Sequence, residues 1–144
     1  MAVATFGESV KRTEDPRLIT GRGKYVDDVR LTGMAHLAFV RSTYGHANIK
    51  SIDTSAALNA PGVIAVFTGA DLQEELGGLP VGWMLPDLKQ PPHPPLAYET
   101  VRYLGDAVAV IVADSAYQAN DAVDLVEVDY EVLPAIVNGE EATK

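Results

Sequence analysis

One run of seven residues, Ala107 to Ala113, is apolar at every position. Side chains along a β-strand alternate between its two faces, so an unbroken apolar run needs cover on both faces. A strand with one face in water would instead alternate apolar and polar residues. We therefore expect this run to be an interior strand at the centre of a sheet.

The residues after this run predict a helix and then a second strand. Ser115 and Gln118 have the spacing of a capping box, in which each side chain satisfies a backbone donor of the other. Apolar residues then recur at helical spacing from Ala119 onward. Between Val126 and Val132 apolar residues alternate with acids, which is typical of a half-buried strand.

The first half of the chain predicts a similar unit. Residues 34–42 and 46–52 have the composition of two strands and are interpreted as a hairpin. Thr54 is expected to cap a short helix that ends at Pro61 and Gly62, and residues 62–68 return as a strand. Two strand–helix–strand units, over 46–68 and 107–132, favour an α+β domain over a doubly wound sheet.

Length and composition exclude several classes of protein. With 144 residues, 47% of them hydrophobic, the chain can bury one core and is expected to form one domain. It has no apolar run of membrane-spanning length and no secretory signal pattern, so we expect a soluble, cytoplasmic protein. It has no cysteine, which excludes disulfides and thiolate-held iron–sulfur clusters within it. A net charge of −9 disfavours nucleic acid as a partner.

The charge is distributed unevenly along the chain. Residues 1–53 carry eight basic and six acidic residues, whereas residues 54–144 carry three and fourteen. The basic residues gather in residues 1–33, which show no periodicity and are interpreted as an extended N-terminal arm. Two roles are open for it: a mobile terminus, or a strap that docks on acidic surface of other domains.

A long segment, residues 73–99, lacks periodicity and holds six of the nine prolines. Loops of this length are functional or disordered, so its apolar residues need an explanation. They could form a small cluster that ties the loop to its own domain, or an apolar wall that contacts other domains. The main residues concerned are Leu79, Val81, Trp83, Met84 and Leu85.

The remaining polar motifs favour structural roles. The pair Gly21 and Gly23 lacks the strand, third glycine and helix of a phosphate-binding motif, so a turn is expected. The adjacent acids Asp27 and Asp28 point opposite ways in an extended chain and are expected in a turn or cap. The histidines match no metal-ligand spacing and are expected to be structural; they are His36, His46 and His93. The acids of the last strand are expected to form a solvated face; they are Glu127, Asp129 and Glu131.

Many short motifs in one order resemble a known family. The first block runs from Glu14 to Leu72 and contains TGRGKYVDD, SIDTSAA and PGVIAVFTGADL. The second runs from Val101 to Ala135 and contains VRYLGDAVAVIVAD and VEVDYEVLPA. Together they resemble the opening of the large subunit of molybdenum hydroxylases, the family of carbon monoxide dehydrogenases, xanthine dehydrogenases and aldehyde oxidases. Thr43 and Gly45 depart locally from the usual family pattern, at a turn.

The resemblance implies an α/β-hammerhead domain, with a mixed sheet and two short helices packed on it. It would occupy residues 34–137, with the extended N-terminal arm over residues 1–33 before it and a linker beginning at 138–144. The long loop would lie toward the substrate channel, with Leu79, Trp83, Met84 and Leu85 as candidate channel residues. No catalytic, cofactor-binding or metal-ligating residue is expected in the chain.

The resemblance also implies a larger enzyme around this chain, which we expect to be a fragment or detached module. The parent subunit would hold a molybdopterin-type molybdenum cofactor, and iron–sulfur clusters and FAD would lie in partner domains or subunits. The parent would oxidise a small substrate with water as oxygen donor, and carbon monoxide is the first candidate because that branch is most similar. This chain alone is expected to be inactive. The alternative is a free-standing assembly module without enzymatic activity.

Overall fold

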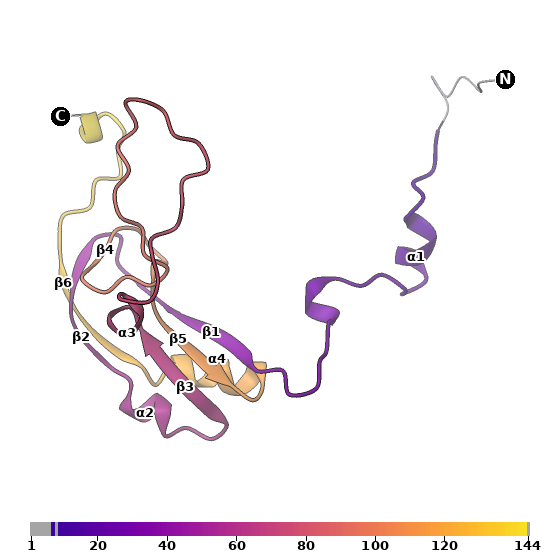
Figure 1. Ribbon diagram of the computed structural model, residues 1–144, viewed down its shortest axis with the longest axis horizontal. Coiled ribbons are helices and arrows are strands. Elements are labelled where there is room, and N and C mark those ends of the chain that lie inside the picture. Colours follow the sequence, from indigo (N-terminus) through magenta and orange to yellow (C-terminus); the bar gives the residue numbers. More distant parts are fainter. Residues whose placement is uncertain (1–6, 8, 144) are drawn as a thin grey trace. The chain divides into compact units, whose positions relative to one another are not determined.

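The computed structural model describes residue 7 and residues 9–143 (Figure 1). Residues 1–6 and 8 of the predicted arm, and Lys144 of the predicted linker, lie outside the described residues. The chain divides into two compact units, with the boundary between Met34 and Ala35.

The first unit contains two short helical elements, α1 (Asp15–Ile19) and the 3-10 turn η1 (Val26–Asp28), and neither buries a residue. Exposed ion pairs join Arg12 to Asp15 and Arg17 to Glu14. Exposed pairs of this kind contribute about 0–1 kcal/mol each, so they organise α1 only locally. Asp28 accepts a hydrogen bond from the Tyr25 backbone N–H at 2.9 Å, which is the turn role predicted for this acid.

The second unit is built on two antiparallel sheets of three strands each. We name each sheet after its central strand. The β5 sheet has the order β1 (His36–Arg41), β5 (Ala107–Ala113), β3 (Val63–Thr68). The β2 sheet has the order β4 (Thr100–Val101), β2 (Ala47–Asp53), β6 (Glu127–Val132). The remaining elements are α2 (Ser55–Leu58), α3 (Gly69–Leu72), α4 (Ala116–Val123) and the 3-10 turn η2 (Glu141–Thr143).

The predicted central strand is confirmed: β5 lies between β1 and β3, and six of its seven residues are buried. Val108 and Ile111 are fully buried and belong to the main core cluster, which also receives Val101 of β4. Ala119 of α4 packs with Ala38 and Ala113 to cover one end of the same sheet face. The α+β class is therefore confirmed, with two antiparallel sheets in place of one mixed sheet.

The predicted hairpin between residues 34–42 and 46–52 is wrong. β1 pairs with β5, whereas β2 pairs with β4 and β6. The chain passes from one sheet to the other over residues 42–46, where the Ser42 hydroxyl lies 2.9–3.0 Å from the Tyr44 backbone O and N. The local pattern identifies both strands, but their partners are chosen by apolar segments that are distant in the sequence.

Both predicted strand–helix–strand units are present, and each joins the two sheets. β2–α2–β3 runs from the β2 sheet to the β5 sheet, and β5–α4–β6 runs back. The predicted Thr54 cap is absent, because the Asp53 carboxylate instead accepts from the Ser55 N–H at 2.9 Å. Ser115 does cap α4, since its hydroxyl oxygen accepts from the Gln118 N–H at 3.3 Å.

Candidate functional site

The long loop over residues 73–99 contains no helix or strand and connects α3 to β4 (Figure 1). One bond closes it across its width, from the Leu79 N–H to the His93 carbonyl at 2.8 Å. Its return end is anchored: Leu96 and Ala97 are buried, and the Ala97 N–H donates to Ala107 of β5 at 2.7 Å. The loop therefore has a fixed base and an open tip.

The predicted channel residues lie on the open part of this loop. Trp83 is 75% exposed and Met84 is 67% exposed, and Leu79 and Leu85 are more than half exposed. None of the four belongs to the three buried clusters formed by the described residues. These four side chains therefore lie outside the buried core of their own domain.

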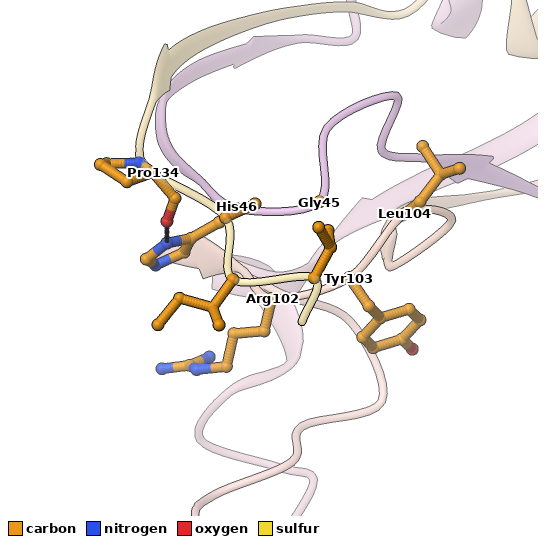
Figure 2. Close-up of a pocket in the computed structure, with 9 residues that line it drawn as sticks. Gly45, His46, Arg102, Tyr103, Leu104 and Pro134 are labelled. Atoms are coloured by element: carbon orange, nitrogen blue, oxygen red, sulfur yellow. Dashed lines mark hydrogen bonds between the residues drawn. The ribbon is translucent and has the colours of Figure 1, made fainter. Parts of the chain in front are cut away.

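A second feature is an open hollow of about 480 Å³ at the ends of β2, β4 and β6 (Figure 2). It is lined by three segments that are far apart in the sequence. They are Gly45–His46, Arg102–Leu104 and Pro134–Val137. No local sequence pattern predicts this hollow, because only the pairing of β2 with β4 and β6 brings the three segments together.

The polar groups of the hollow are engaged with the backbone. His46 Nδ1 lies 2.7 Å from the Pro134 carbonyl oxygen. A carbonyl can only accept, so Nδ1 carries the proton and holds the segment after β6 against the start of β2. Arg102 donates to the Thr100 carbonyl at 3.2 Å. The hollow is thus a mainly apolar recess in which the His46 ring and the Arg102 guanidinium are bonded to backbone carbonyls.

A buried carboxylate is bonded to one of the segments that line the hollow. Asp106 is 7% exposed and accepts from the Arg102 backbone N–H at 3.1 Å. Burial, followed by the charge of Asp106, raises the pKa of Tyr103. Burial also raises the pKa of Tyr130, whose ring meets that of Tyr44 edge-on at 5.3 Å. An ordinary phenol is already protonated at neutral pH, so these upward shifts do not change the charge of either group there.

The other candidate residues do not come together. Within residues 7 and 9–143, no three His, Cys, Asp or Glu side chains are placed to hold a metal ion. His93 packs edge-on against Tyr103, with ring centroids 6.1 Å apart, while His36 lies on β1. The acids Glu127, Asp129 and Glu131 lie on the exposed side of β6, as predicted. In the described residues, no helix has the length and apolar character needed to cross a membrane.

Gly21 has a φ of +70° and supplies the expected turn after α1. This left-handed conformation is open to glycine at no steric cost. A phosphate-binding motif needs a helix directly after the glycines. Here the element after Gly23 is the 3-10 turn η1, so that helix is missing. The turn interpretation of this glycine pair is supported.

Comparison with known proteins identifies the same architecture elsewhere. A family model described as "Aldehyde oxidase and xanthine dehydrogenase, a/b hammerhead domain" matches residues 20–134. The nicotine 6-hydroxylase large subunit of Paenarthrobacter nicotinovorans is 43% identical over 133 residues, which is 92% of this chain and 16% of that protein. The carbon monoxide dehydrogenase large chain of Afipia carboxidovorans is 50% identical over 128 residues, which is 89% of this chain and 15% of that protein.

Solved structures agree in three dimensions. The crystal structure of quinoline 2-oxidoreductase from Pseudomonas putida 86 matches with a TM-score of 0.88 at 43% identity, covering 94% of this chain and 17% of that one. The Cu,Mo-containing carbon monoxide dehydrogenase matches with a TM-score of 0.82 at 47% identity, covering 94% of this chain and 16% of that one. This chain therefore spans about one sixth of the length of these relatives.

Proposed function

Because the chain belongs to the aldehyde oxidase and xanthine dehydrogenase a/b hammerhead family, we propose that it serves as the hammerhead domain of a molybdenum hydroxylase large subunit. The observation that carries this proposal is the near-complete match of the chain to one region of large subunits, at 43–50% identity. The parent reaction is oxidation of a small substrate with water as oxygen donor. Carbon monoxide is the first candidate, supported by the 50% identity to a carbon monoxide dehydrogenase chain.

The role of this domain in that subunit is structural and channel-lining rather than catalytic. Its described residues bring no three His, Cys, Asp or Glu side chains together, and no reaction step is assigned to them. The molybdopterin-type cofactor belongs to later domains of the subunit, and the iron–sulfur clusters and FAD belong to partner domains or subunits. What this domain contributes is apolar surface, above all the exposed side chains of the long loop.

The loop tip is proposed as part of the wall of the substrate channel. Trp83 is 75% exposed although it is a large apolar side chain, and exposed apolar patches commonly mark sites of contact with a ligand or partner. The four candidate channel side chains are uncharged, so they would select a substrate by shape and apolar contact. Loss of one large side chain from such a wall changes the fit of bulky substrates more than that of small ones.

This proposal is tested with Trp83→Ala in the complete enzyme. We expect the ratio of kcat/KM values for a bulky and a small substrate to change by about tenfold, which is the scale of discrimination one apolar contact provides. Tyr117→Ala on α4 is the matched control, since Tyr117 is a similarly exposed aromatic residue outside the loop. An unchanged ratio in the Trp83 variant, or an equal change in both variants, contradicts the proposal.

The N-terminal arm is proposed as a strap across other domains of the same subunit. Its described residues are almost all exposed, and its basic side chains include Lys11, Arg22 and Lys24. Cations on an extended segment favour docking on acidic surface. Amide hydrogen exchange tests this: residues 9–33 should be protected in the assembled enzyme and unprotected in the separate chain. Equal exchange in both states contradicts it.

A further inference from the structure

The face of the β5 sheet that points away from the core is apolar across all three strands. Directly paired residues of antiparallel strands share a face. Leu37 of β1 and Ala65 of β3 both pair with Val112, and Phe39 of β1 and Phe67 of β3 both pair with Val110. These two rows run across the three strands. Figure 1 shows the strands β1, β5 and β3 of this sheet. We call them the outer face of the β5 sheet.

Three of the six residues in these rows are exposed to solvent. Leu37 is 61% exposed, and Phe39 and Phe67 are 43% and 39% exposed. Ile64, which occupies the bulge in β3, is 58% exposed beside them. Only one end is covered, where Val110 packs with Leu96 and Leu72.

The second sheet of the same domain shows how an outer face in water is built. On the β2 sheet the outward pairs are polar: Asn48 with Glu131, Ser51 with Asp129, and Asp53 with Glu127. Antiparallel sheets with one solvated face show this alternation, whereas strands that are apolar on both faces are covered on both. The β5 sheet is apolar on both faces, but its outer face is only partly covered in this domain.

We propose that the outer face of the β5 sheet is the docking surface on which a later segment of the same large-subunit polypeptide packs. This inference rests on the proposed function, because it requires the domain to belong to a longer chain. The relatives carry about five sixths of their length outside the matched region, so such a segment has ample chain to come from. The two rows themselves contain no charged residue, and the Arg41 guanidinium lies 5.5 Å from the centre of the Phe39 ring at their edge, so the segment must be mainly apolar.

The size of the face favours a segment of the same chain over a second copy of the domain. Four partly exposed side chains of this kind present roughly 400 Å² of apolar surface, taking about 200 Å² for each large side chain when open. A stable complex between separate chains buries about 800 Å² on each partner. A tethered segment needs less, because the linkage raises its effective concentration at the surface.

Cysteine labelling of the complete large subunit tests whether another segment covers the outer face of the β5 sheet. Phe39→Cys places a thiol on the outer face, and Glu131→Cys places one on the polar face of the β2 sheet as the matched control. Peptide mass spectrometry then gives the maleimide labelling rate at each position. We expect the thiol at position 39 to label at least about tenfold more slowly than the thiol at position 131 in the native subunit and equally fast in urea. Equal rates in the native subunit overturn the proposal.

The occupant is identified by cross-linking. Benzoylphenylalanine built in at position 67 should cross-link to a peptide of the same polypeptide beyond residue 144. A cross-linked dimer of the subunit, or a link to another subunit, overturns the assignment. Hydroxyl-radical footprinting of Phe39 and Phe67 in the unaltered protein guards against a folding defect in the variants. Fast oxidation of both rings there also overturns the proposal.

The same preparation separates this inference from the proposed function. Its molybdenum content reports on the proposed function, whereas the labelling reports on the outer face. A molybdenum-free assembly in which a later segment covers Phe39 would contradict the proposed function and support the docking surface. A molybdenum-containing enzyme whose outer face is open would support the proposed function and contradict the docking surface. If the protein exists only as the separate chain, fast labelling of the thiol at position 39 overturns the docking surface.

Discussion

Gly69 lies at the start of α3, where the return end of the long loop passes over it. A Cβ atom at this position would lie 2.6 Å from the carbonyl oxygen of Ala97 and 2.7 Å from that of Leu96. Both neighbours are backbone atoms of buried residues, and the Ala97 N–H is bonded to Ala107 of β5 at 2.7 Å. Gly69→Ala therefore forces the base of the loop away from the central strand.

The expected cost is that of an overpacked interior. Such changes destabilise proteins by about 1–3 kcal/mol. For a chain of this size each kcal/mol lowers the melting temperature by about 2–4 °C, so we expect a fall of about 2–12 °C. Differential scanning calorimetry and urea unfolding measure it. Limited proteolysis within residues 73–95 should also accelerate, since the loop loses part of its anchor.

Gly77→Ala is the control for this change. Gly77 lies in the same loop, its added Cβ would meet nothing within 4 Å, and its φ is not in the left-handed region. An alanine there removes freedom from the unfolded chain without strain, so stability should stay equal or rise slightly. A Gly69→Ala variant as stable as the original protein, or an equal loss in both variants, refutes the argument that backbone contact fixes the loop base.

Three further predictions concern the core, the cap of α4 and one carboxylate. Ile111 is a fully buried residue of β5, and Ile111→Ala should lower the free energy of unfolding, measured in urea, by about 2–5 kcal/mol. Leu37→Ala on the open outer face should lower it much less. Similar losses in the two variants would contradict the burial pattern. Ser115→Ala should cost about 1 kcal/mol by removing the N-cap bond to Gln118, and Ser115→Asp should retain most of that stability, which thermal unfolding can check. Hydrogen bonds from the Thr68 backbone N–H, and then from its hydroxyl, hold the pKa of Asp71 below its ordinary value. The Asp71 carboxylate therefore stabilises the fold at pH values above that ordinary pKa, and this stabilisation is lost as pH falls through the lowered pKa. Thr68→Val should raise the pKa of Asp71 in an NMR titration, and an unchanged value contradicts the role of the hydroxyl.

Local patterns in the sequence were sufficient to place the strands and helices that depend on nearby residues. The apolar run predicted β5, the alternation after Val126 predicted β6, and Ser115 was correctly assigned as the cap of α4. Each of these signals lies within a few residues of the structure it predicts. The family resemblance, spread over many motifs, supplied the hammerhead architecture that no single pattern could give.

Long-range pairing was the part that local patterns could not supply. β1 and β2 follow each other with a short connection, which favours a hairpin. In the structure β1 instead pairs with β5, and β2 pairs with β6. The hollow at Gly45–His46 depends on the same pairing, and so does the close contact between Gly69 and Ala97. The exposure of Trp83 was likewise open, because the sequence cannot say whether its own domain covers it.

Native mass spectrometry of the protein purified from its source tests the central claim most directly. The account predicts that residues 1–144 are recovered within an assembly that carries molybdenum, iron and flavin. Recovery of a separate 15.4 kDa chain that is free of molybdenum and bound to an unrelated partner would contradict it, and would favour an assembly module instead.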